Sequence, residues 1–425
     1  MQRRNILVSA YAFSPYQGSE CAVGWNIVIR LAKAYDVTVL CGDLSGTRRM
    51  KNDLERYFKL NPPIQGLCVH YVAPGLLIRF FEKMHTFPGL WMSYYLAYNL
   101  WQREAFKEAC KLHMHRPFDL VHQLNMIGFR ESGYLWRLKI PFVWGPVGGS
   151  PNEPLAFIGQ FSLMGGLRVV VRNMINNFQK RTAWRSRLAA HCASKLWAVT
   201  SADVQTMRDL WGMNVEQMLE TGVTVRHDLC PRSWGGQEAL RIVWSGIHLP
   251  RKALPIFLHA VAGLEEKDRI IIDVLGEGPE SAGWKALAER LGLNENVTWH
   301  GMLPHEKALS VMSDAHLMAF SSLKEGTPHV VLEALSLGLP VICHDACGMG
   351  IAVTKKCGIK IPLCDPQTSI EGFSQAIRRI FDDKALVESL SRGALERAAE
   401  LSWDKKVEEI VAGYEDVVIN RQEGK

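Results

Sequence analysis

The sequence predicts an α/β protein made of two doubly wound, Rossmann-like domains that face a cleft. Short apolar strands alternate with amphipathic helices along most of the chain, which is typical of parallel sheets. The alternation stops in a Gly-, Pro- and polar-rich segment, 223–240, and then begins again. The chain has 425 residues, of which 48% are hydrophobic, so it is long enough to bury two cores.

The first domain is expected over residues 1–222. A strand at 5–13 leads through a loop into a helix at 22–34 and then into a strand at 36–42, which forms a β–α–β unit. Further strands are expected at 118–124, 140–149 and 195–200. The segment 223–240 is expected to be an interdomain linker.

The second domain is expected over residues 241–401. Apolar segments predict strands at 240–246, 269–278, 297–301, 316–322 and 341–345, with helical segments between most of them. Ligands of such sheets bind at the carboxyl ends of the strands, so the loops that follow the strands are the first places to look for a site.

One of these loops enters a helix within 324–340, "KEGTPHVVLEALSLGLP". Thr327 is expected to cap this helix, and Gly338 to end it. The first N–H groups of a helix suit a diphosphate. Glu333, inside the helix, is placed to accept hydrogen bonds from a ribose diol, and Glu325, before it, from a second hydroxylated group. The alternative for each glutamate is a structural salt bridge.

Cations and a glycine follow other strands. Arg251 and Lys252 come after the strand at 240–246 and are placed to neutralise a leaving diphosphate, unless they are ordinary surface charges. Gly18, in the first loop, would let a phosphate approach the backbone, or it marks a plain tight turn. His122 ends a strand and is either a donor to a sugar hydroxyl or a structural histidine.

Several classes of function are disfavoured. No G-x-G-x-x-G or G-x-x-x-x-G-K-[ST] motif is present, which argues against a nicotinamide dehydrogenase and a P-loop enzyme. The ten cysteines include no C-x-x-C pair, so no metal site is expected. No nucleic-acid-binding motif accompanies the basic residues, so no nucleic-acid partner is expected.

The charge is divided unequally along the chain. Residues 1–235 hold 28 Lys and Arg against 16 Asp and Glu, whereas the remainder holds 21 against 27. A basic first half suits an anionic partner such as membrane lipid or a pyrophosphate-linked acceptor. Residues 151–200 carry seven Lys and Arg against one acid, with Leu167, Val171, Ile175 and Phe178 at helical spacing. This pattern predicts either an interfacial helix on an anionic membrane or a core-packed helix with a charged exterior.

No membrane-spanning segment or signal peptide is expected. The aromatic segment 84–102 lacks charged residues but is too interrupted to span a bilayer, and the first residues read as a strand. The expected location is the cytoplasm, with peripheral attachment to the inner face of the membrane as a candidate.

Five segments together resemble glycosyltransferase family 4, a retaining family with the GT-B fold and an E-x7-E motif. They are "SGIHLPRKAL", "VLGEGPE", "VTWHGMLPHEKALSVMSDA", "FSSLKEGTPHVVLEALSLGLPVICHD" and "LSWDKKVEEIVAGYEDV", and they cover nearly all of 240–417 in the family's order. Residues 129–149 are similar to a subset of bacterial polysaccharide and lipopolysaccharide transferases. In similar proteins the last helix, here within 402–425, crosses back to the first domain.

The resemblance implies a role for each of these residues. Glu333 is expected to hold the donor ribose, Glu325 the donor sugar and Lys252 the diphosphate. Glu325, His122 and Lys252 are the residues expected to carry catalysis. The residues expected to bind the donor are Gly18, Gly246, Arg251, Lys252, Glu277, Glu325, Gly326, Thr327, His329, Val330 and Glu333.

The expected function is retaining transfer of a sugar from a nucleotide-diphosphate sugar, a co-substrate, to a hydroxyl of a lipid-linked or oligosaccharide acceptor. No cofactor is expected. One departure stands out, because Ile247 occupies the position where the family usually has Arg; Arg251 and His248 are the candidates to replace that cation. The alternatives are a non-catalytic sugar-nucleotide-binding protein or partner subunit, and a nucleotide-sugar epimerase.

Overall fold

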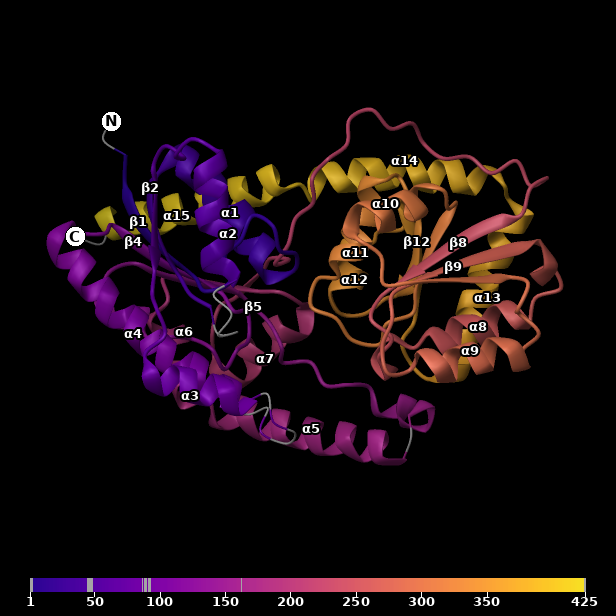
Figure 1. Ribbon diagram of the computed structural model, residues 1–425, viewed down its shortest axis with the longest axis horizontal. Helices are drawn as coiled ribbons and strands as arrows, with labels where there is room; N and C mark the ends of the chain where they lie inside the picture. Colours follow the sequence, from indigo (N-terminus) through magenta and orange to yellow (C-terminus); the bar gives the residue numbers. More distant parts are fainter. Residues whose placement is uncertain are drawn as a thin grey trace. The chain divides into compact units, whose positions relative to one another are not determined.

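Two fully parallel β-sheets organise the chain in the computed structural model (Figure 1), which describes residues 3–43, 49–85, 87, 90, 93–161 and 163–423. The contacts divide the chain into two compact units of α/β structure. Unit 1 comprises Met1–Ser150, Gln179–Glu220 and Trp403–Lys425, and unit 2 comprises Pro151–Phe178 and Thr221–Ser402. The predicted fold class, α/β with two Rossmann-like sheets, is confirmed.

Unit 1 contains a seven-stranded sheet in the order β3-β2-β1-β4-β5-β6-β7. Its strands are β1 (Asn5–Ala10), β2 (Asp36–Cys41), β3 (Leu67–Tyr71), β4 (Leu120–Asn125), β5 (Phe142–Val147), β6 (Lys195–Ala198) and β7 (Glu216–Gln217). Its helices are α1 (Glu20–Ala34), α2 (Arg49–Leu60), α3 (Leu76–His85), α4 (Ser93–His115), α6 (Trp184–Cys192), α7 (Ser201–Trp211) and α15 (Trp403–Glu423). The order reverses between β1 and β4, as in doubly wound sheets.

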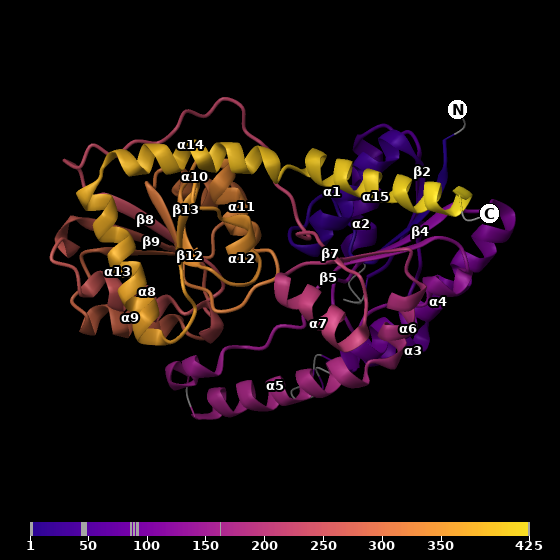
Figure 2. The same cartoon turned by 180° about the vertical axis from the view of Figure 1, so that it is seen from behind.

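Helices cover both faces of this sheet (Figures 1 and 2). α1 and α15 pack side by side over one apolar core, and α4, α6 and α7 cover the other. Central strands are therefore buried on both sides; every residue of β1 and β4 is buried.

Unit 2 contains a six-stranded sheet in the order β10-β9-β8-β11-β12-β13. Its strands are β8 (Leu240–Ser245), β9 (Ile270–Leu275), β10 (Val297–Gly301), β11 (Leu317–Phe320), β12 (Val341–His344) and β13 (Gly358–Ile361). Its helices are α5 (Leu163–Thr182, which runs into unit 1 at its end), α8 (Leu254–Ala262), α9 (Ser281–Arg290), α10 (His305–Ser313), α11 (His329–Ser336), α12 (Cys347–Ala352), α13 (Pro366–Asp382) and α14 (Ala385–Glu400).

α8, α9 and α13 cover one face of the second sheet, and α10, α11 and α14 cover the other (Figures 1 and 2). The order reverses between β8 and β11, because the chain crosses to the opposite face after β10. The loops that follow these two neighbouring strands therefore meet at one edge of the sheet, which is where the site residues gather.

The expected domain boundary requires a correction. Residues 151–178 were assigned to the first domain, but they pack with unit 2. The cause is Phe157, on a 3-10 helix at Leu155–Gln160, whose fully buried side chain belongs to the core of the second sheet. Burial of a phenylalanine is worth roughly 2 kcal/mol, so this side chain favours the packing of its segment against the second sheet.

None of the helices in the described part of the chain has both the length and the hydrophobicity needed to cross a bilayer. Within the segment 84–102, α3 ends at His85 and α4 begins at Ser93, and residues 86, 88, 89, 91 and 92 lie outside the described residues.

Candidate functional site

An ion-pair cluster lies at the carboxyl ends of β8 and β11. A 3-10 turn after β8, Pro250–Lys252, carries Arg251 and Lys252, and the loop after β11 carries Ser322 and Glu325. The two strands are hydrogen-bonded neighbours, so their loops leave the same edge of the sheet. The main chain joins the loops as well, since the N–H of Leu323 donates to the carbonyl of Arg251 at 2.8 Å.

Glu325 is the centre of this cluster. Its Oε1 lies 2.6 Å from Lys252 Nζ and 2.7 Å from an Arg251 guanidinium nitrogen. The same oxygen accepts a hydrogen bond from Ser322 Oγ at 2.7 Å. The Glu325 and Lys252 side chains are only 13% and 12% exposed, so these charges interact largely out of water. The structure thus brings together Arg251 and Lys252, which were predicted at the diphosphate, and Glu325, which was predicted at the donor sugar.

The protonation states follow from burial and charge. Burial alone would raise the pKa of Glu325, but the attraction of Lys252 and Arg251 outweighs it and holds the pKa below the ordinary value. Burial lowers the pKa of Lys252, against the opposing pull of Glu325. At neutral pH we therefore treat the cluster as one carboxylate between two cations.

The helix α11 begins one residue later than predicted. Thr327 was expected to be the N-cap residue, but Pro328 occupies that position, and its side chain makes no capping hydrogen bond. The first helical N–H groups, those of His329 and Val330, have no acceptor inside the helix by geometry and carry its partial positive charge. Gly326 lies in the preceding turn against α12, where a Cβ on Gly348 would fall 1.6 Å from the Gly326 carbonyl oxygen.

The Glu333 side chain is only partly buried, although most of the residues around it on α11 are apolar. Its side chain is 30% exposed, and Oε1 lies 2.9 Å from His305 Nε2 on α10. His305 is 63% exposed, so this pair is open to solvent and to a ligand. One turn away, His329 Nδ1 pairs with Thr221 Oγ1 at 3.2 Å, and burial lowers the pKa of His329 below its ordinary value.

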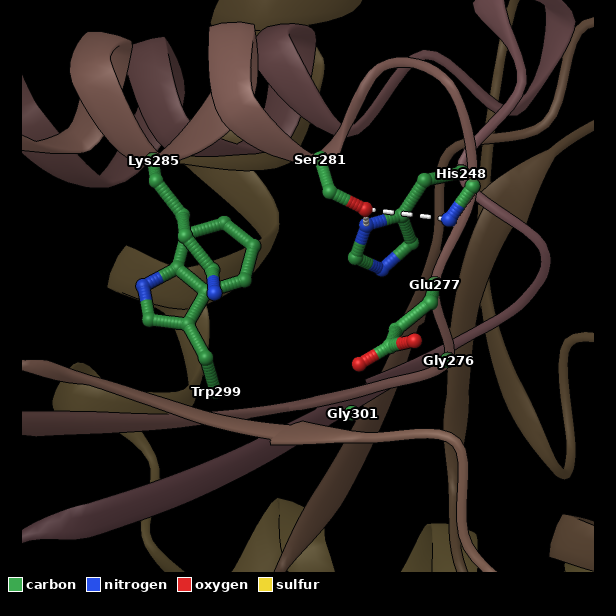
Figure 3. A pocket seen from close by; sticks show the side chains of 8 residues that line it. His248, Gly276, Glu277, Ser281, Lys285, Trp299 and Gly301 are labelled. Atoms are coloured by element: carbon green, nitrogen blue, oxygen red, sulfur yellow. Dashed lines mark hydrogen bonds between the residues drawn. The ribbon is translucent and has the colours of Figure 1, made fainter.

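A pocket of about 450 Å³ opens at the carboxyl ends of β8, β9 and β10 (Figure 3). It is lined by His248, Gly276, Glu277, Gly278, Ser281, Lys285, Trp299 and Gly301. The Glu277 carboxylate extends into it from one side, and Lys285 lies over the Trp299 ring on the other, 5.7 Å from its centroid. The pocket therefore offers a cation, a carboxylate and an aromatic face.

His248 adds a ring nitrogen to this pocket. Its Nδ1 pairs with Ser281 Oγ at 2.7 Å, while its buried Nε2 has no hydrogen-bond partner among the described residues. Burial, helped by the nearby Lys285, lowers the pKa of His248. Of the two residues considered as replacements for the cation missing at Ile247, Arg251 lies beside Glu325, whereas His248 lines this pocket.

Two glycines allow the pocket's loops to close. A Cβ on Gly276 would lie 2.1 Å from the carbonyl oxygen of Gly246, and a Cβ on Gly278 would lie 2.5 Å from that of His248. Gly276 also has a φ of +107°, which side-chain-bearing residues rarely adopt. The loops after β8 and β9 thus pack backbone against backbone.

The structure gathers most of the predicted site residues at one edge of the second sheet. Those in unit 2 are Gly246, Arg251, Lys252, Glu277, Glu325, Gly326, Thr327, His329, Val330 and Glu333. Gly18 and His122 belong to unit 1. Gly18 is exposed in the loop before α1, and a Cβ there would touch nothing within 4 Å, so the backbone is open to approach.

The expectation that His122 contacts a sugar is wrong. The side chain is completely buried, and burial lowers its pKa to about 4. Its Nε2–H donates to the Gly145 carbonyl at 2.7 Å and its Nδ1 pairs with the Tyr414 hydroxyl at 2.6 Å. β4 is a central strand, and this side chain faces the core beneath α15 rather than the strand end. His122 is thus a structural histidine.

Five residues of the site were not predicted from the sequence, namely Ser281, Lys285, Trp299, His305 and Ser322. Two signals point to them in retrospect. Ser281 and Lys285 are four residues apart, which places them on one face of the helix that follows the "GEGP" loop. Ser322 lies two residues after the end of β11, near the carboxyl end where sheet ligands bind. No group of three or more His, Cys, Asp or Glu suited to a metal ion occurs among the residues the structure describes.

Comparisons with known proteins match this part of the chain. Residues 237–397 match the family model described as glycosyl transferases group 1. The D-inositol 3-phosphate glycosyltransferase of Streptomyces bingchenggensis is 29% identical over 180 residues, which are 40% of this chain and 38% of that protein. The enzyme of the same name from Salinispora tropica is 27% identical over 326 residues, 71% of this chain and 64% of that protein. The chain thus spans less than two fifths of the length of the first relative.

Solved structures resemble the whole chain. Sucrose-phosphate synthase from Thermosynechococcus elongatus superposes with a TM-score of 0.62 at 16% identity, covering 98% of this chain and all of that one. Anabaena HepE, solved in complex with UDP and glucose, superposes with a TM-score of 0.59 at 16% identity, covering 97% of this chain and all of that one. At these identities the structures establish a shared fold, which is GT-B.

Proposed function

We propose that this chain is a retaining glycosyltransferase that moves a sugar from a nucleotide-diphosphate sugar to a hydroxyl acceptor. One observation carries the proposal: Glu325 stands with Arg251 and Lys252 beside the first turn of α11, within the region that matches the glycosyl transferases group 1 model. Membership of family 4 and the pairing of Glu325 with Glu333 as its E-x7-E motif are part of this proposal.

The donor diphosphate is assigned to the cations and the helix start. A departing nucleoside diphosphate gains negative charge, and donors fixed in advance stabilise that charge most effectively. Lys252 is held by Glu325, so its ammonium is positioned before any donor arrives. The N–H groups of His329 and Val330 supply the partial positive charge of a helix N-terminus. Arg251 supplies a second cation, in place of the arginine that Ile247 replaces.

The donor sugar and ribose are assigned to the two glutamates. Glu325 keeps a carboxylate at neutral pH, because two cations hold its pKa low, and a carboxylate accepts hydrogen bonds from sugar hydroxyls. Glu333 is partly exposed and exchanges its bond to His305 for the ribose diol. The pocket beside Glu277 is assigned to part of the donor nucleotide, since it combines an aromatic face with polar groups.

The reaction is proposed to proceed with retention, by attack of the acceptor hydroxyl on the face that the leaving group departs from. In that mechanism the leaving phosphate takes the acceptor proton, so no side chain need act as the base. His122 takes no part, because it is sealed in the core of unit 1. The chain's own contribution is to orient the donor and to stabilise the diphosphate.

The acceptor is proposed to be a lipid-linked glycan of cell-surface or exopolysaccharide biosynthesis. The similarity of residues 129–149 to transferases of that kind supports this choice. The first relative's name points instead to inositol 3-phosphate, but the match covers only 40% of this chain. Both acceptor classes therefore belong in the test.

The test measures nucleoside diphosphate release by the purified chain across a panel of nucleotide sugars. Each donor is tried alone, with inositol 3-phosphate and with extracted lipid-linked glycans. The expected result is release that depends on an acceptor, with an α-glycoside as the product when the donor sugar is α-linked. Conversion of the donor sugar without acceptor would indicate an epimerase, and donor binding with no turnover under any condition would indicate a non-catalytic binding protein.

The control for this test is a pair of variants. Lys252→Met removes the proposed diphosphate cation and should abolish release. Lys307→Met changes a lysine outside the site, on α10, and should leave release unchanged. Equal release by both variants would overturn the assignment of the site.

A further inference from the structure

The helix α5 presents an apolar face to solvent. Its exposed apolar side chains recur every three or four residues between positions 163 and 178, which places them on one side of the helix. They are Leu163 (97% exposed), Met164 (60%), Leu167 (58%), Val171 (45%), Met174 (67%), Ile175 (47%) and Phe178 (67%). We call these seven residues the α5 face; α5 is visible along its length in Figures 1 and 2.

The inward side of α5 holds two asparagines beside a glycine and a valine, whereas an ordinary amphipathic helix buries a continuous apolar side. Its buried residues are Gly166, Val169, Asn173 and Asn176. Asn173 accepts from the N–H of Glu153 at 3.0 Å and donates to its carbonyl at 2.8 Å. Asn176 donates to Asn152 Oδ1 at 2.8 Å. These hydrogen bonds hold α5 in one orientation about its own axis, with the asparagines turned inward and the apolar side facing solvent.

The charges on α5 are all positive. The helix contains Arg168, Arg172, Lys180 and Arg181 and no acidic residue. The three arginines are exposed, and Arg168 and Arg181 flank the α5 face on its two edges by helical geometry. Arg172 pairs with Glu153 at 3.1 Å through one nitrogen of its guanidinium. An exposed apolar stripe with basic edges is the pattern of a helix that lies in the interface of a bilayer.

We propose that the α5 face docks on an anionic phospholipid bilayer, with the helix parallel to the membrane plane. The seven apolar side chains enter the boundary between headgroups and acyl chains, and the arginines contact lipid phosphates. The positive charge of α5 favours an anionic bilayer over a second copy of the chain as the partner of this face. Two α5 faces brought together would place like charges side by side, whereas anionic headgroups neutralise them. The proposal goes beyond the proposed reaction and does not depend on it.

The experiment is flotation of the full-length chain with vesicles of phosphatidylcholine alone or with 30% phosphatidylglycerol. The chain is expected to float with the anionic vesicles at about 0.1 M salt and to stay largely unbound with neutral ones. The variant Met174→Glu/Phe178→Glu should reduce binding more than tenfold, because it places carboxylates in the middle of the apolar face. The variant Arg168→Gln/Arg181→Gln should reduce binding about fivefold for each arginine removed and weaken its salt dependence.

A matched control changes exposed apolar residues elsewhere. Leu60 and Met114, on α2 and α4, are 70% and 75% exposed, so Leu60→Glu/Met114→Glu makes the same chemical change away from α5. This control is expected to float like the unchanged chain. All variants alter exposed side chains, so circular dichroism and thermal unfolding should match the unchanged chain and exclude a folding defect.

Three outcomes would overturn the proposal. In the first, the unchanged chain remains unbound to anionic vesicles. In the second, the Met174→Glu/Phe178→Glu variant floats as well as the control. In the third outcome, light scattering finds a dimer of the unchanged chain that the Met174→Glu/Phe178→Glu variant loses, with no binding to vesicles. That result would assign the α5 face to a second copy instead.

Discussion

Lys252 Nζ lies 2.6 Å from Glu325 Oε1, and both side chains are almost withdrawn from water. The two residues come from loops after neighbouring strands, 73 positions apart in the chain, and they meet because β8 and β11 are adjacent. A carboxylate that keeps a buried ammonium charged and immobile prepares the site for an anion. The ion pair is thus a structural element and, under the proposed function, part of the donor site.

Glu325→Gln should reduce both activity and stability. The amide keeps the shape of the carboxylate but leaves Lys252 and Arg251 without their counter-charge, which costs about 3 kcal/mol for a largely buried pair. We expect kcat to fall by about a hundredfold or more, as for other residues that stabilise charge. Urea unfolding and steady-state kinetics measure the two effects. Glu306→Gln, at a side chain 90% exposed, is the control that should change neither. Full activity of Glu325→Gln would remove Glu325 from the mechanism.

Glu333→Gln should weaken donor binding while leaving stability unchanged. The side chain is 30% exposed and pairs with an exposed His305, and such pairs contribute at most about 1 kcal/mol to folding. Loss of a charged acceptor for the ribose diol should raise the donor Kd about tenfold. Calorimetric titration with the nucleotide sugar gives the Kd, and thermal unfolding gives the stability. An unchanged Kd would contradict the ribose assignment.

Gly276→Ala should destabilise unit 2, and Gly283→Ala should not. A Cβ at position 276 meets the Gly246 carbonyl oxygen at 2.1 Å, and φ is +107° there, so we expect a loss of about 2 kcal/mol or more. Gly283 lies inside α9, where a Cβ meets nothing within 4 Å. Alanine at that position should stabilise the helix by up to about 1 kcal/mol. Urea unfolding of the two variants compares them directly; equal stability would mean that the β8 and β9 loops separate at little cost.

His122→Gln should reduce the loss of stability in acid. The pKa of His122 is about 4 in the folded chain, against an unfolded value of about 6.5, so the unfolded chain binds more protons between these values. The stabilisation is fully present above pH 6.5 and is lost as the pH falls toward 4, by about 2 kcal/mol between pH 7 and pH 5. Urea unfolding at these two pH values should show a difference smaller by that amount in the variant. His191→Gln, at an exposed histidine, should keep the full difference.

The architecture could be predicted from local pattern. The run "RIIIDVL" predicts a strand buried on both faces, and the structure has one at Ile270–Leu275. The strand "VTWHG" was predicted with its observed bounds, Val297–Gly301. Short edge strands such as Glu216–Gln217 were missed, because two exposed polar residues have no apolar pattern.

Most of the other errors concern which neighbour a residue meets. Phe157 was assigned to the wrong unit, because its hydrophobicity requires a core but does not say which one. His122 was placed at the surface of a site, whereas its position in a central strand turns it toward Tyr414, 292 residues further along the chain. Thr327 was expected to be the N-cap of α11, whereas Pro328 occupies that position.

The sequence by itself determined the alternation of strands and helices, the doubly wound fold class and the loops in which the site residues stand. These properties depend on periodicity and on residues that begin or end elements, which act over a few positions. Only the tertiary structure decided that Arg251, Lys252 and Ser322 converge on Glu325, and that α5 turns its asparagines inward and its apolar side to solvent. Such relationships depend on the adjacency of strands and on hydrogen bonds between distant segments, and the local sequence pattern predicts neither.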